Sequence, residues 1–135
     1  MKKLSALLLT GVMLLMFASC SGSKNIQGTW NATDAMEKSF TIEIGENEMT
    51  MNYANGTSST FEYTQNRVGT SNGISYYGIV MDGMNYSIVF PDKGNGNLAI
   101  MLQPTDDNDL SGTMIYALNR EEEPGYRDYA SKYLS

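Results

Sequence analysis

Apolar and polar residues alternate along the chain from Ile26 onward, and turn-forming residues separate the alternating stretches. Alternation with a period of two is typical of β-strands that bury one face. The pattern predicts eight antiparallel strands over residues 26–32, 40–44, 49–53, 59–63, 75–81, 84–90, 98–102 and 110–118. We therefore expect an all-β domain.

The strand partners can be predicted because facing residues of an antiparallel pair lie on the same side of the sheet. Asp82-Gly83 is a strong two-residue turn signal. At Asn55-Gly56 a two-residue turn would mix apolar and polar faces, so a longer turn is expected there. The predicted pairs are Met81 with Met84, Tyr77 with Ile88, Ile44 with Met49, Phe40 with Tyr53, Met51 with Phe61, Phe90 with Leu98, Ile88 with Ile100, Leu102 with Leu110, and Leu98 with Met114.

Eight short strands with one shared apolar face must close into a barrel or fold into two packed sheets, since an open sheet exposes that face and both edges. We expect a small antiparallel barrel in which the eight strands form a meander. After it, Pro124-Gly125 breaks the chain, and Tyr126, Tyr129 and Tyr133 recur at helical spacing. This spacing predicts a short C-terminal helix packed outside the barrel. A tyrosine-lined recognition surface is the alternative.

Gly28-Thr29-Trp30 stands on the first predicted strand, and Arg120 follows the last one. In this respect the chain resembles the lipocalin-like proteins, which carry Gly-x-Trp on the first strand of an eight-stranded barrel. The resemblance implies that Trp30 and Arg120 pack together as a structural clasp that closes one end of the barrel. It also implies a small apolar or aromatic ligand in the interior. The residues expected to line that site are Tyr53, Phe61, Tyr77, Tyr86, Phe90 and Tyr116.

The same six side chains could instead fill the interior of so small a barrel. The protein would then act as an interaction module of the cell envelope, through its loops, its acidic surface or its terminal tyrosines. The two hypotheses differ in one observable feature. A ligand-sized space in the interior favours binding, whereas a dry packed core favours interaction with another envelope protein.

The N-terminus has the order of a secretory signal: Lys2 and Lys3, an apolar run over residues 4–17, then small residues before Cys20. Phe17-Ala18-Ser19-Cys20 resembles the lipobox of bacterial lipoproteins, with Phe17 in place of the usual Leu. An exported chain with a single cysteine cannot form an internal disulfide, which favours acylation of Cys20. The resemblance implies a membrane anchor through acylated Cys20, on the extracytoplasmic side, at the outer membrane or the cell surface.

The predicted organisation is a signal peptide over residues 1–19, a short flexible lipidated tether over 20–25, the barrel over 26–120, and a C-terminal segment over 121–135. Of the nine basic residues, the signal peptide removes two, so seven remain against fifteen acidic ones, a formal charge of −8. Nucleic acids and anionic lipids are recognised by basic patches, so neither is an expected electrostatic partner.

Side chains suited to catalysis are scarce. The chain has no histidine and no cysteine besides Cys20, so the usual general bases, thiol nucleophiles and zinc ligands are missing. We expect neither an enzyme nor a bound cofactor or metal. Asp107 to Gly112 matches the first half of a calcium loop, but Leu118 stands where the final Glu is needed, and a plain hairpin loop is the alternative.

Overall fold

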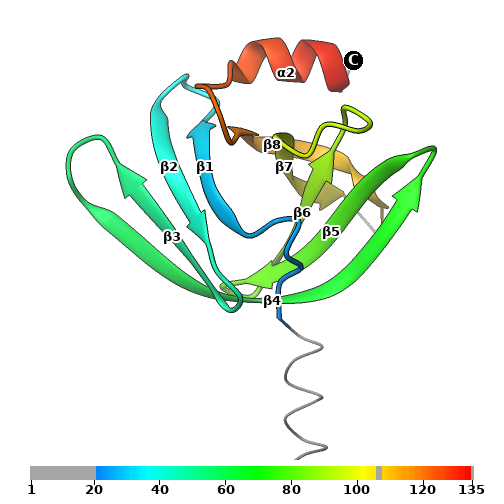
Figure 1. The fold of residues 1–135 in the computed structure, drawn as a ribbon, viewed down its shortest axis with the longest axis horizontal. Helices are drawn as coiled ribbons and strands as arrows, with labels where there is room; N and C mark the ends of the chain where they lie inside the picture. Colours follow the sequence, from blue (N-terminus) through cyan, green and yellow to red (C-terminus); the bar gives the residue numbers. More distant parts are fainter. Residues whose placement is uncertain (1–20, 106–107, 135) are drawn as a thin grey trace, which may run out of the picture.

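The computed structural model describes residues 21–105 and 108–134. The predicted signal peptide, Cys20 and Asp107 lie outside these residues. The described chain forms a closed antiparallel barrel followed by a helix (Figure 1). Its elements are β1 (Gly28–Thr33), β2 (Ser39–Ile44), β3 (Glu48–Tyr53), β4 (Ser58–Ser71), β5 (Ile74–Met81), β6 (Met84–Phe90), β7 (Leu98–Thr105), β8 (Asn108–Asn119) and α2 (Tyr126–Tyr133).

The predicted eight-stranded barrel is confirmed. Each strand pairs with its neighbour in sequence, and β1 closes the ring by pairing with β8, where Ala32 lies opposite Leu118. A ring of this kind leaves no strand edge unpaired along the closed part of the sheet, so no edge invites pairing with another chain there.

Two of the predicted hairpins have the expected register. In the β2–β3 hairpin Ile44 lies opposite Met49 and Phe40 lies opposite Tyr53. In the β5–β6 hairpin the pairs are Met81 with Met84 and Tyr77 with Ile88. The β2–β3 hairpin has one apolar and one polar face, so the pattern of burial determines its register. The β5–β6 hairpin carries Tyr76 and Val89 on its outer face as well, and there the Asp82-Gly83 turn determines the register.

The predicted pairing of Met51 with Phe61 is wrong. Met51 lies opposite Ser59, and Phe61 lies opposite Met49. The backbone N–H of Tyr53 donates to the carbonyl of Thr57 at 2.9 Å, which closes a tighter turn than expected. Because the shift is two residues, Phe61 keeps the predicted face and only its height in the barrel changes.

The predicted registers around β7 are also wrong. Ile88 lies opposite Met101 rather than Ile100, a shift of one residue. In the next hairpin Leu102 lies opposite Met114, and Leu98 lies opposite Asn119. Burial could not determine these registers because β7 is apolar on both faces, with one face toward the interior and the other under α2.

Strand β4 is much longer than predicted and continues to Ser71. Its second half, residues 64–71, is rich in polar residues and pairs with β5, with an irregularity between Gln65 and Arg67. The β4–β5 hairpin extends away from the rest of the barrel at one side (Figure 1). Without a buried face this segment shows no apolar alternation, so the pattern did not predict it.

Two groups of apolar side chains stabilise the fold. The first fills the barrel and includes Trp30, Ile42, Ile79 and Leu118, all with no exposed surface. The second lies outside the barrel between the wall and α2, where Tyr129 packs with side chains of β6, β7 and β8. The prediction of a C-terminal helix packed outside the barrel is therefore confirmed.

Candidate functional site

The barrel has two different ends. Connections of an antiparallel meander alternate between the ends, so residues 45–47, 72–73 and 91–97 lie at one end together with Arg120. We call this the clasp end. Residues 34–38 and 54–57 lie at the other end, which we call the mouth end. The strands are staggered, so the β5–β6 turn (residues 82–83) lies beside Asn47 and shares a groove with it.

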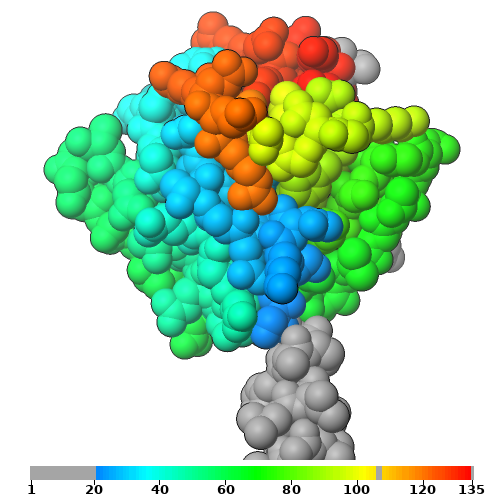
Figure 2. Space-filling view, viewed as in Figure 1, coloured from blue at the N-terminus to red at the C-terminus, as the bar shows by residue number. Residues whose placement is uncertain are grey.

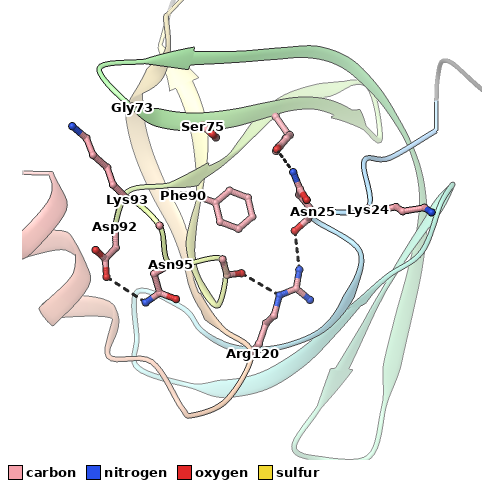
Figure 3. Close-up of a pocket in the computed structure, with 12 residues that line it drawn as sticks. Lys24, Asn25, Gly73, Ser75, Phe90, Asp92, Lys93, Asn95 and Arg120 are labelled. Carbon is pink, nitrogen blue, oxygen red and sulfur yellow. Dashed lines mark hydrogen bonds between the residues drawn. The ribbon is translucent and has the colours of Figure 1, made fainter.

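The structure brings the two residues of the predicted clasp together. The guanidinium carbon of Arg120 lies 4.0 Å from the centre of the Trp30 ring. Arg120 Nη1 donates to the carbonyl of Gln27 at 2.8 Å. Its Nη2 donates to the carbonyl of Asn25 at 2.7 Å, a bond that is drawn in Figure 3. The indole N–H of Trp30 donates to the carbonyl of Ile26 at 2.9 Å. The end of β8 is thereby tied to the segment that enters β1.

Gly28 makes room for this contact. Its φ is +121°, a backbone conformation that favours glycine, and a Cβ at this position would lie 2.6 Å from Arg120 Nη1. Glycine is therefore favoured at position 28 for two reasons: the backbone conformation suits it, and the Arg120 side chain leaves no room for a Cβ.

Tyr77 and Phe90, two of the predicted lining residues, lie at the clasp end and are packed. Phe90 contacts the Trp30 ring at a centroid distance of 6.0 Å and the Tyr77 ring at 5.8 Å. The Tyr77 hydroxyl accepts a hydrogen bond from Asn25 Nδ2 at 2.7 Å. Their exposed fractions are only 6% and 9%. Both rings therefore pack against the clasp and are almost inaccessible to a ligand.

A polar cleft of about 390 Å³ adjoins these rings at the clasp end (Figure 3). Its walls are the segment before β1, the β4–β5 turn and the β6–β7 loop, with Lys24, Lys93 and Asp92 among the lining side chains. In Figure 3 both lysine side chains extend away from Phe90 at the centre of the cleft. Arg120 also lines the cleft, with its guanidinium bound to backbone carbonyls, while Tyr77 and Phe90 expose little of their rings to it.

The section between the two ends is filled by side chains. Ile42, Met49, Ile79, Ile88 and Met101 come from different strands and each has no exposed surface. A side chain with no exposed surface borders no space that admits water. The deep interior cup implied by the lipocalin resemblance is therefore replaced at this level by a packed core.

The mouth end carries an aromatic cluster. The Phe40 ring lies 5.6 Å from that of Tyr53 and 5.0 Å from that of Tyr116, the second pair edge to face. The hydroxyls of both tyrosines point to Met51, at 3.6 Å and 3.9 Å from its sulfur. We call Phe40, Met51, Tyr53 and Tyr116 the tyrosine mouth.

A cleft of about 480 Å³ opens beside the tyrosine mouth. All three aromatic rings of the tyrosine mouth line this cleft, together with Asp34 and Lys38. Tyr53 is 37% exposed, far more than the aromatic residues of the clasp end. Burial raises the pKa of Tyr116, and the nearby Tyr53, Tyr86 and Asp34 raise it further, so its hydroxyl remains protonated at neutral pH.

The six predicted lining residues thus do not form one site. Tyr53 and Tyr116 lie together, and Tyr86 is close enough to Tyr116 to influence its ionisation. Phe61 is half-buried in the barrel wall opposite Met49. Phe40 and Met51 were missed as site residues, although the predicted pairing of Phe40 with Tyr53 already placed those two side by side.

Asp109, from the predicted calcium motif, is engaged elsewhere. Its Oδ1 accepts hydrogen bonds from Arg67 Nε at 2.7 Å and from Ser87 Oγ at 3.1 Å. The Arg67 side chain crosses β5 over Gly78, where a Cβ would lie 2.4 Å from Nε. This carboxylate therefore joins β8 to β4 and β6.

Within residues 21–105 and 108–134, no three His, Cys, Asp or Glu side chains are grouped closely enough to hold a metal ion. Over the same residues, no helix is long and apolar enough to cross a membrane.

Comparisons with protein-family models, with curated proteins and with solved structures find no match to the chain.

Proposed function

We propose that this protein is a lipid-anchored lipoprotein of the cell envelope, on the extracytoplasmic side of the membrane, whose barrel binds a small apolar or aromatic ligand at the tyrosine mouth. The observation that carries the binding proposal is the cluster of Phe40, Tyr53 and Tyr116 at the edge of a cleft of about 480 Å³. Partly exposed aromatic rings gathered in a concavity are typical of ligand sites.

The packed core limits how deeply a ligand enters. Met51 and the fully buried side chains below it form the floor, so the ligand occupies the mouth and remains in contact with the loops over residues 34–38 and 54–57. A flat aromatic molecule of one or two rings suits a site of this volume. The tyrosine hydroxyls and the Asp34 carboxylate offer hydrogen bonds at its edge.

We infer that the activity is binding and not catalysis. Burial raises the pKa of Tyr116, so its hydroxyl is protonated at neutral pH, and the chain contains no histidine to accept a proton. The sulfur of Met51 is a weak acceptor and a poor nucleophile. The chemistry available at this site is stacking, dispersion and hydrogen bonding.

The packed core also favours a second function, that of an envelope interaction module. In that case the exposed ring of Tyr53 and the nearby loops would contact a protein surface, since aromatic residues are enriched at such interfaces. The two functions differ in the size of the partner. A small molecule would occupy the cleft, whereas a protein would cover the loops around it.

Binding can be tested with the fluorescent probe 1-anilinonaphthalene-8-sulfonate, which becomes bright in apolar sites. We expect the wild-type protein to bind it, and Tyr53→Ala and Tyr116→Ala each to weaken that binding several-fold. Val68→Ala, which changes an exposed residue of the β4–β5 hairpin, serves as the matched control. Equal binding by all four proteins, or no binding by the wild type, would contradict the proposal.

The anchor can be tested separately in the bacterial cell. We expect Cys20→Ser to leave the precursor unprocessed or to release the protein from the membrane fraction. Mass spectrometry of the wild-type N-terminal peptide should show Cys20 carrying acyl chains. Equal processing and equal membrane association of both proteins would refute the lipoprotein assignment.

A further inference from the structure

Residues 21–25, which the sequence predicts as a flexible tether, are bound to the barrel. The N–H of Gly22 donates to the carbonyl of Glu46 at 2.8 Å, in the β2–β3 turn. Ser23 and Gln65 exchange two hydrogen bonds: the N–H of Ser23 donates to Gln65 Oε1, and Gln65 Nε2 donates to Ser23 Oγ, both at 2.8 Å. Gln27 Nε2 donates to the carbonyl of Gly22 at 2.7 Å.

The position of Gly22 admits only glycine. This residue is buried, and a Cβ would lie 1.9 Å from the hydroxyl oxygen of Tyr63. Tyr63 is itself only 2% exposed and donates a hydrogen bond to the carbonyl of Gly45, so it has little freedom to move aside. A side chain at position 22 would therefore force the segment off the barrel.

The following residues are fixed by the clasp. Asn25 donates to the hydroxyl of Tyr77, and its carbonyl accepts from Arg120. The backbone from Gly22 to Gln27 is thus attached to β4, to the β2–β3 turn and to the residue that follows β8. We call this stretch the docked segment.

We propose that the docked segment holds the barrel in one orientation on the lipid bilayer, with the β2–β3 turn and the adjoining part of β4 resting on the headgroups. This inference rests on the proposed acylation of Cys20. Only Ser21 stands between Cys20 and Gly22 in the chain, and the two Cα–Cα steps from Cys20 to Gly22 span at most about 7 Å. A lipid attached at Cys20 therefore keeps the docking point within one headgroup layer of the membrane.

The geometry decides which surfaces face away. The first described residues, in blue, lie on the side of the molecule opposite α2, in red (Figures 1 and 2). The docking point also adjoins the β2–β3 turn, at the clasp end, so the tyrosine mouth opens at the end remote from it. A ligand or partner would reach the mouth from the aqueous side.

The contact does not depend on attraction to anionic lipid. Glu46 lies in the β2–β3 turn and Glu48 begins β3, and Lys24 is the one basic residue of the docked segment. The orientation is maintained by hydrogen bonds and by the packing of Gly22, and we expect it to be insensitive to salt.

A fluorophore attached to a single introduced cysteine tests the orientation, with the lipidated full-length protein in phosphatidylcholine vesicles that contain headgroup nitroxides. We expect Glu46→Cys to give labels that are quenched several-fold more strongly than those of Asp128→Cys on α2. Adding Gln65→Leu, which removes both bonds to Ser23, should reduce that difference. Gly22→Val should abolish it, and Val68→Ala should leave it unchanged.

Trypsin gives a second measurement, because Lys24 is the first basic residue after Cys20 and cleavage there frees the barrel from its anchor. We expect release from vesicles to be several-fold faster for Gln65→Leu than for the wild type. A wild-type N-terminal peptide without acyl chains would refute the anchor itself. An acylated wild-type protein with equal quenching at both positions, or with release unaffected by Gln65→Leu, would refute the fixed orientation alone.

Discussion

The guanidinium of Arg120 lies over the indole of Trp30, with its central carbon 4.0 Å from the ring centre. The contact joins the residue after the last strand to the first strand, beside the ladder in which Ala32 faces Leu118. That β1–β8 ladder is shorter than the β1–β2 ladder. The side-chain contact therefore reinforces the closure of the barrel where backbone pairing is limited.

Trp30→Ala should destabilise the protein by about 3–5 kcal/mol, because it leaves a cavity at a fully buried site. Arg120→Ala should cost less, since its guanidinium is partly solvated. The free energy of unfolding can be measured by denaturant titration for both single variants and the double variant. We expect the double variant to lose less stability than the sum of the two, which reports the coupling.

Strictly additive effects would show that the stacking contributes nothing. Arg120→Lys is the matched control, because lysine keeps the charge but has a single nitrogen in place of the Nη1 and Nη2 that donate to the carbonyls of Gln27 and Asn25. It should recover only part of the stability lost in Arg120→Ala.

Gly28→Ala should destabilise the barrel by about 1–3 kcal/mol, since alanine strongly disfavours a φ of +121°. The new methyl group would also collide with Arg120. In the Arg120→Ala background the collision is absent. The loss of stability from Gly28→Ala should then fall to the contribution of the unfavourable φ alone. Thermal unfolding of the four proteins gives both values, and an identical cost in both backgrounds would argue against the collision.

Stability should fall between pH 10 and pH 12 through Tyr63. Burial raises the pKa of this phenol to about 12, and the charge of Glu46 also raises it. Because the folded state favours the protonated phenol, its contribution is complete below the unfolded pKa of about 10 and is lost as the pH rises through 12. Tyr63→Phe should reduce this loss of stability at high pH. Part of the loss should remain, because the pKa values of Tyr116 and Tyr129 are also raised. An unchanged pH profile would contradict this assignment.

Asp109→Ala should destabilise the protein by about 1–3 kcal/mol, because it leaves Arg67 and the buried Ser87 hydroxyl without their shared acceptor. Asp109→Asn, which keeps an acceptor but removes the charge, should cost less. Chemical denaturation ranks the two, and the opposite order would show that the charge is unfavourable at this half-buried position.

The sequence predicts this fold well where one face of a strand is apolar and the other polar. Ile42 and Met51 are fully or almost fully buried between polar neighbours, and their hairpin has the predicted register. The prediction fails where the contrast disappears. Leu98, Ile100 and Leu102 face α2 on the outside of β7, while Ala99 and Met101 face inward, so either register buries apolar residues.

Docking of the N-terminal segment could not be predicted for a different reason. It depends on hydrogen bonds between Ser23 and Gln65 and on the space that Gly22 leaves under Tyr63, and these residues are distant in the sequence.

The candidate site was predicted only in part because alternation identifies the inward face but not the height of a side chain along the barrel. Tyr77 and Tyr116 both face inward, yet they lie at opposite ends.

The central claim is that the tyrosine mouth holds a small ligand, and mass spectrometry of molecules bound to the protein tests it most directly. The wild-type protein and the Tyr53→Ala/Tyr116→Ala double variant would be purified in parallel from the membrane, denatured, and their extracts compared, with Val68→Ala as the control. We predict an apolar or aromatic compound in the extracts of the wild type and the control, strongly depleted in that of the double variant. A compound retained equally by a folded double variant, or none in any extract, would contradict the claim.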